Sequence, residues 1–158
     1  MRERGFSLIE LLIVVAIILV IAGIAIPSYI RSRIASNESS AVYSIRTINT
    51  AQVTYAATYP TVGYATALSQ LASPASGSAN SANAGILDNV LGCPSATCQK
   101  SGYNFTITNA SGNPVSAYSV WGTPIAVGTS GQRGFCSDSL NPIMYDPLGG
   151  TSCTQPLE

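Results

Sequence analysis

An unbroken apolar stretch near the N-terminus is the strongest pattern in the chain. From Phe6 to Ile26 there are 21 residues, and Glu10 is the only one among them that carries a charge. As a helix this segment would be roughly 31 Å long, close to the thickness of the hydrocarbon core of a bilayer. The pattern therefore predicts a membrane-spanning helix over 6–26.

A second helical pattern follows the apolar stretch. Residues 30–59 contain no glycine or proline, and their apolar positions recur mostly at steps of three, four and seven, which is typical of a helix with one packing face: Ile34, Ala41, Val42, Ile45, Ile48, Gln52/Val53 and Ala56. Pro60 predicts the end of the helix at Tyr59, because the residue before a proline disfavours helical geometry. We therefore expect one helix over 6–59, with Tyr43, Tyr55 and Tyr59 packed in the core and a kink at Pro27, where a backbone hydrogen bond is lost.

Beyond Pro60 the period of the pattern changes. A polar loop rich in serine and alanine covers 72–81, and alternation of large and polar residues then predicts strands at 103–107, 118–121, 133–136 and 142–145, with a turn at 109–114. Neighbouring strands joined by short turns form an antiparallel sheet that can cover a helix with one face. We expect an α+β fold with an amphipathic helix over 27–59 and a globular head over 60–158.

The four cysteines, Cys93, Cys98, Cys136 and Cys153, all lie in the expected head. An even number of cysteines indicates disulfides and an oxidising compartment, which places the N-terminus in the cytoplasm. Three pairings are open, and we favour a short 93–98 loop together with a 136–153 link from a strand to the C-terminal tail. Zinc is disfavoured because the chain has no histidine and no paired C-x-x-C spacing.

Several classes of chemistry lack their usual residues. The absence of histidine removes the commonest general base and points away from an enzyme, and we expect neither a cofactor nor a metal. A calcium site is a weak alternative in which Asp138 and Asp146 meet at one end of the sheet. From Thr61 onward the only basic residues are Lys100 and Arg133, so we expect no direct nucleic-acid binding.

The N-terminus resembles a known signal. A short charged leader ending at Gly5, followed by Phe6-Ser7-Leu8-Ile9-Glu10 and a long apolar helix, is similar to the class III signal of type IV pilins and pseudopilins. The resemblance implies a leader over 1–5, cleavage after Gly5 by a prepilin peptidase and N-methylation of Phe6. Pro27 falls where the pilin helix usually carries its proline. The family's fold agrees with the α+β fold predicted above, and its frequent C-terminal disulfide loop agrees with the 136–153 link.

The same resemblance gives Glu10 a role. A charged side chain in a membrane span costs at least a few kcal/mol, so an unpaired carboxylate there calls for a functional explanation. In the family, the glutamate at this position pairs with the positively charged α-amino group of a neighbouring subunit during assembly. The expected function is a type IV pilin that is stored in the inner membrane and polymerises, with the assembly machinery, into a pilus for adhesion or motility. The alternatives are a periplasmic pseudopilin of type II secretion, a DNA-uptake pilus subunit and a membrane-anchored binding module.

Overall fold

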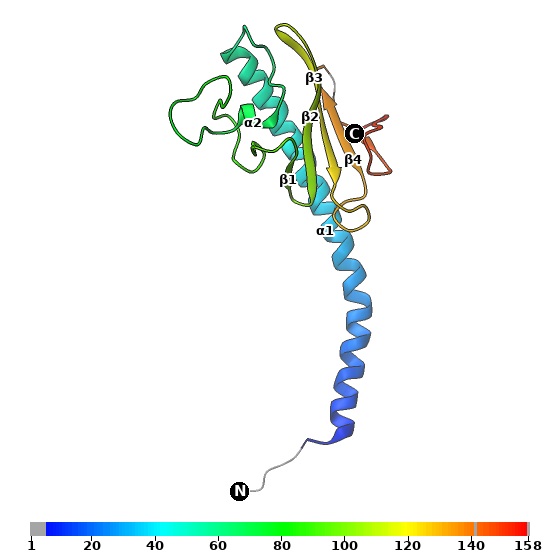
Figure 1. The fold of residues 1–158 in the computed structure, drawn as a ribbon. Coiled ribbons are helices and arrows are strands. Elements are labelled where there is room, and N and C mark those ends of the chain that lie inside the picture. Colours follow the sequence, from blue (N-terminus) through cyan, green and yellow to red (C-terminus); the bar gives the residue numbers. More distant parts are fainter. Residues whose placement is uncertain (1–5, 141, 158) are drawn as a thin grey trace. The chain divides into compact units, whose positions relative to one another are not determined.

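The computed structural model describes residues 6–140 and 142–157. Within them the chain forms a long helix α1 (Leu8–Thr58), a one-turn helix α2 (Leu68–Leu71) and a six-stranded sheet (Figure 1). Helix α1 ends next to the stop predicted at Tyr59. Contacts divide the chain into an N-terminal unit up to Arg33 and a C-terminal unit from Ile34 onward, and each is described by itself.

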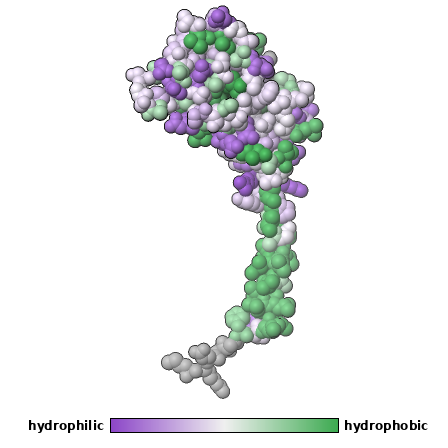
Figure 2. Space-filling view, viewed as in Figure 1, coloured by the Kyte–Doolittle hydropathy of each residue, from purple (hydrophilic) through white to green (hydrophobic). Residues whose placement is uncertain are grey.

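The N-terminal unit presents its apolar side chains to the surroundings. Every residue over 6–30 is exposed except Ala22, which is half-buried. Figure 2 shows the hydrophobic colour concentrated on this part of α1. The helix is long and apolar enough to cross a membrane. Pro27 lies inside α1, and the kink predicted there stays a prediction.

The sheet of the C-terminal unit is an antiparallel meander in the order β1-β2-β3-β4-β5-β6. Its strands are β1 (Cys98–Lys100), β2 (Tyr103–Gly112), β3 (Val115–Pro124), β4 (Gly134–Asp138), β5 (Met144–Asp146) and β6 (Gln155–Pro156). The four predicted strands are present, and the predicted α+β fold with a meander sheet is confirmed. The turn predicted at 109–114 is shorter than expected, because β2 continues through an irregularity between Thr108 and Ser111 as far as Gly112.

The core lies between α1 and the inner face of the sheet. On the helix Ala41, Ile45, Ile48 and Tyr55 have no exposed surface, and they share the core with buried sheet residues such as Phe105, Val120 and Phe135. The helix and the sheet approach closely at Gly122. A Cβ added there would lie 3.2 Å from Ile45 Cδ1 and 3.1 Å from Phe105 Cε1, so a larger residue would push the two layers apart.

One expectation about the amphipathic helix is wrong: Tyr43 is 68% exposed, so it does not pack in the core. Tyr43 lies two positions from both Ala41 and Ile45, and two positions along a helix turn a side chain to the opposite side. Of the two residues given for one position of the packing face, Gln52 and Val53, Gln52 is the one that is buried, whereas Val53 is 62% exposed. Tyr55 is buried as expected, and its ring lies 5.0 Å from that of Tyr59.

Candidate functional site

The start of α1 holds the carboxylate that the sequence singles out. Ser7 immediately precedes the helix, and its backbone N–H donates a hydrogen bond of 3.1 Å to Glu10 Oε2. Ser-x-x-Glu is the pattern of a capping box, in which the glutamate returns to the backbone N–H of the capping residue. Glu10 therefore stabilises the first turn of its own helix. Sequence reasoning missed this contact, although the Ser7–Glu10 spacing could have revealed it.

The charge of Glu10 is not matched within the part of the chain that the structure describes. The two ion pairs found there join Lys100 to Asp88 and Arg133 to Glu38. Phe6 is 80% exposed, four positions before Glu10. Gly5, after which cleavage is expected, lies outside the described residues. The cap supplies one neutral donor, so the carboxylate can still attract a cation.

A second carboxylate, Glu38, ties the C-terminal unit together. Its Oε1 accepts hydrogen bonds of 3.0 Å from the backbone N–H groups of both Gln132 and Arg133. Its Oε2 accepts bonds of 2.9 Å and 2.7 Å from Nε and Nη2 of Arg133. Both guanidinium bonds thus converge on one carboxylate oxygen, and hydrogen bonds between ionised partners are among the strongest polar contacts in proteins. The Glu38–Arg133 pair thus fixes the start of β4 against α1.

The surroundings of this pair favour the charged form of Glu38. Burial by itself raises the pKa of Glu38, but the hydrogen bonds from Arg133 and Gln132 outweigh burial and hold that pKa below its ordinary value of 4.5. The guanidinium lies 5.6 Å from the centroid of Phe135 and 5.2 Å from that of Tyr145. The Tyr103 hydroxyl donates a bond of 2.8 Å to the Arg133 carbonyl. The carboxylate and its guanidinium partner are therefore both held in place.

A polar residue also anchors the segment that follows α1. The side-chain amide of Gln52 donates to the Ala65 carbonyl at 2.9 Å and accepts from the Ala65 N–H at 2.8 Å. Gln52 is fully buried, and its amide acts as a short piece of strand for the passing backbone. Neither Gln52 nor Glu38 was assigned a role from the sequence. Both lie on the apolar stripe of the helix, which is the signal that could have identified them.

The cysteines form two disulfides, Cys93–Cys98 and Cys136–Cys153. This is the pairing that the sequence analysis favoured among the three open ones. The first closes a short loop before β1, and the second joins β4 to the C-terminal segment between β5 and β6. Both lie in the C-terminal unit, where they restrict the loops around the sheet.

The two aspartates suggested as a calcium pair do not meet. Asp146 lies opposite Gly134 at the first residue of β4, whereas Asp138 is the last residue of that strand. Four residues of strand place them about 13 Å apart. The Asp146 carboxylate instead accepts the N–H groups of Leu148 and Ser152. Within the described residues no three His, Cys, Asp or Glu side chains gather into a possible metal site.

Comparisons with known proteins support the resemblance of the N-terminus. The family model of the prokaryotic N-terminal methylation motif matches residues 1–26. Over 54 residues the chain is 48% identical to the type IV major pilin protein PilA of Myxococcus xanthus, a match that covers 34% of this chain and 24% of that protein. The matched region thus spans about a quarter of the length of the curated relative. No solved structure matches the chain.

Proposed function

We propose that this type IV pilin-like chain is a structural subunit, not an enzyme, and that it assembles with copies of itself into a filament. A prepilin peptidase cuts after Gly5, Phe6 is N-methylated, and the helix over 6–26 holds the subunit in the inner membrane until assembly. The methylation motif over residues 1–26 and the similarity to a type IV major pilin support this proposal.

The observation that carries the proposal is the exposed apolar segment with one carboxylate in it. Apolar side chains as exposed as Leu19 (66%) and Ile24 (75%) are unfavourable in water, so the segment calls for lipid or other helices around it. A bilayer supplies the first environment, and a bundle of neighbouring N-terminal helices supplies the second. Polymerisation is the exchange of one for the other.

Glu10 gives this exchange its register. After cleavage the new amine at Phe6 of one subunit lies at a depth that a staggered neighbour's Glu10 can reach. Attraction between opposite charges is strong in a medium of low dielectric constant, although desolvation offsets much of the gain. The pair therefore sets alignment and entry into the filament more than stability. Before assembly, the hydrogen bond from the Ser7 backbone N–H gives the Glu10 carboxylate one partner, and the Phe6 amine of a neighbouring subunit then supplies the opposite charge.

The remaining boundaries follow from this role. The leader is 1–5, the filament-core helix 6–26, the amphipathic helix 27–59 and the head 60–158, with a kink at Pro27 where the helix bends on assembly. The N-terminus lies in the cytoplasm, and the disulfide-bonded head lies in the oxidising compartment across the membrane.

Mass spectrometry of filaments sheared from the cell surface tests the proposal. We expect a chain that begins at N-methyl-Phe6, and the Gly5→Val variant should remain in the membrane as the uncut precursor. A chain confined to the envelope, together with a loss of secretion on its deletion, would indicate a type II secretion pseudopilin instead.

Two substitutions at Glu10 separate its charge from its cap. Glu10→Ala removes both, whereas Glu10→Gln keeps a carbonyl oxygen that can accept the Ser7 N–H. If charge pairing drives assembly, both variants are cut after Gly5 but neither forms filaments. Normal filaments from Glu10→Gln would refute the charge-pairing argument while leaving the pilin assignment intact.

A further inference from the structure

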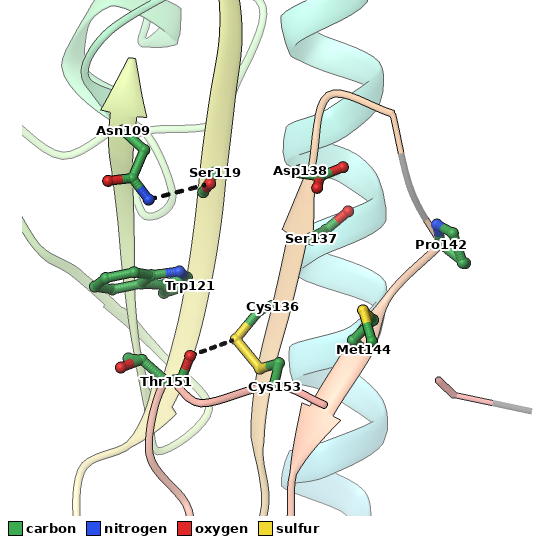
Figure 3. A pocket seen from close by; sticks show the side chains of 10 residues that line it. All are labelled: Asn109, Ser119, Trp121, Cys136, Ser137, Asp138, Pro142, Met144, Thr151 and Cys153. Atoms are coloured by element: carbon green, nitrogen blue, oxygen red, sulfur yellow. Dashed lines mark hydrogen bonds between the residues drawn. A yellow bond between two sulfur atoms is a disulfide. The ribbon is translucent and has the colours of Figure 1, made fainter. Parts of the chain in front are cut away.

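The outer face of the sheet, away from α1, carries a pocket around Trp121, the only tryptophan in the chain. On β3 the buried inward residues are Tyr118, Val120 and Gly122, so Trp121 between them faces outward and is half-buried. Figure 3 shows its indole ring between Asn109 and Thr151, beside the Cys136–Cys153 disulfide. The largest aromatic side chain of the head thus lies outside the core.

The backbone of β2 is distorted where it borders this pocket. Asn109 has a φ of 53°, in the left-handed region, at the irregularity of pairing between Thr108 and Ser111. Irregularities of this kind redirect a side chain and occur often beside binding sites. Here the Asn109 amide points to the Ser119 hydroxyl, with 3.4 Å between Nδ2 and Oγ (Figure 3). The distortion places a group that can donate and accept hydrogen bonds above the indole ring.

The chemistry of the lining is an aromatic surface edged by small polar groups. Ser119 and Thr151 contribute hydroxyls, Asn109 an amide and Asp138 a carboxylate, and none of the ten described lining residues is basic. The volume is about 270 Å³. Pockets for drug-sized ligands measure roughly 300–1,000 Å³, so this one accommodates a single ring rather than several.

We propose that the Trp121 pocket binds one pyranose ring of a neutral carbohydrate. A pyranose has an apolar face of C–H groups, which stacks on an indole, and a rim of hydroxyls, each of which donates and accepts a hydrogen bond. Trp121 forms the stacking surface, and the side chains of Asn109 and Ser119 form hydrogen bonds with the hydroxyls of the sugar. This site lies on the sheet of the C-terminal unit and does not depend on filament formation.

Other ligand classes fit the lining less well. A purely apolar ligand would use the indole but would cover the Asn109 amide and the Ser119 hydroxyl, which have a 3.4 Å contact with each other, without adding a hydrogen bond to either. An anionic sugar would meet the Asp138 carboxylate without a basic residue of the described lining to offset it. A quaternary ammonium ion would use the indole and the carboxylate but leave the amide and hydroxyls without a role.

The single tryptophan makes binding directly measurable. The full chain, in a polyoxyethylene detergent that has no sugar headgroup, is titrated with the methyl glycosides of glucose, galactose, mannose and N-acetylglucosamine while tryptophan fluorescence is recorded. We expect a saturable change with at least one of them, and a response at least about tenfold weaker with glucuronate. No saturable change with any neutral glycoside would overturn the proposal, as would saturation by tetramethylammonium alone.

Two variants test the assigned roles without removing the fluorophore. Asn109→Gly tolerates the left-handed backbone but lacks the amide, so it should weaken binding about tenfold or more while the thermal unfolding midpoint stays close to that of the wild type. Ser111→Ala, on the same strand and exposed, is the matched control and should bind normally. Equal affinity of Asn109→Gly and Ser111→Ala would show that the distortion serves the sheet and not a ligand.

Discussion

Neutralising Glu38 while keeping its shape is the sharpest test of how the C-terminal unit is held together. Glu38→Gln leaves an oxygen that can accept a backbone N–H, but it loses the charge and the second oxygen, which accepts bonds of 2.9 Å and 2.7 Å from the Arg133 guanidinium. The Glu38 side chain is 9% exposed, so its amide replacement stays in the same confined site. The substitution therefore isolates the charged contact.

The expected cost follows from the exposure of the two partners. Removing one partner of a fully buried ion pair costs about 3–5 kcal/mol, because the other charge is left buried and unpaired. The Arg133 side chain is 39% exposed, so water can hydrate part of the released guanidinium. We therefore expect a loss of about 2–3 kcal/mol, below the range for fully buried pairs. At roughly 2–8 °C per kcal/mol for domains near this size, the melting midpoint falls by about 4–24 °C.

The pH dependence gives an independent signature. The pKa of Glu38 in the folded chain lies below its ordinary value of 4.5, so its contribution is complete above that value and is lost as the pH falls through the folded pKa. The advantage of the wild type over Glu38→Gln is therefore constant near neutral pH and shrinks below about pH 4.5. Unfolding is followed through Trp121 fluorescence, which reports on the head alone.

Asp88→Asn supplies the matched control. It is also an acid-to-amide change in an ion pair, but the Lys100–Asp88 distance is 3.6 Å and the Asp88 side chain is 55% exposed. Exposed pairs contribute about 0–1 kcal/mol, so this variant should unfold close to the wild type. If Glu38→Gln lost no more stability than Asp88→Asn, or if its loss were unchanged below pH 4, the Glu38–Arg133 pair would not hold the head as argued.

Three further outcomes follow from other contacts. Gln52→Leu leaves the Ala65 N–H and carbonyl buried without partners and should cost about 1–3 kcal/mol in urea unfolding; an unchanged midpoint would mean that this backbone finds other partners. Cys136→Ser/Cys153→Ser removes a link between residues 17 apart that restricts the unfolded chain, so we expect a loss of about 2–4 kcal/mol by the same measurement; equal stability would mean that this link does not stabilise the head. Tyr43→Ser, at an exposed position, should change stability by less than about 0.5 kcal/mol, and a larger loss would show that its ring is packed.

Periodic patterns predicted most of the elements but not their ends. The alternation at 103–107 and 118–121 identified β2 and β3, yet both strands extend well beyond the regular part of the pattern. The short strands β1 and β6 were missed because three and two residues are too few to show a period. Their pairing depends on the strand beside them, which is tertiary context.

The polar anchors were harder to predict for a different reason. Glu38 and Arg133 are 95 residues apart, and no local pattern connects positions so distant. Likewise the calcium suggestion for Asp138 and Asp146 failed because it required knowing which end of β4 each residue reaches. Sequence proximity was a poor guide to proximity across the sheet.

The buried stripe of α1 nevertheless carries a readable signal. Glu38 and Gln52 each occupy a position where the helical period calls for an apolar side chain, and burying a carboxylate or an amide on a packing face is costly unless partners satisfy it. Glu38 anchors the loop that enters β4, and Gln52 anchors the backbone that leaves the helix. Glu10 repeats the pattern in the apolar segment, with a backbone cap as its only partner among the described residues. Glu38 and Gln52 thus mark two places where the buried stripe of α1 holds another segment by side-chain hydrogen bonds. For Glu10 we propose that this segment belongs to another subunit.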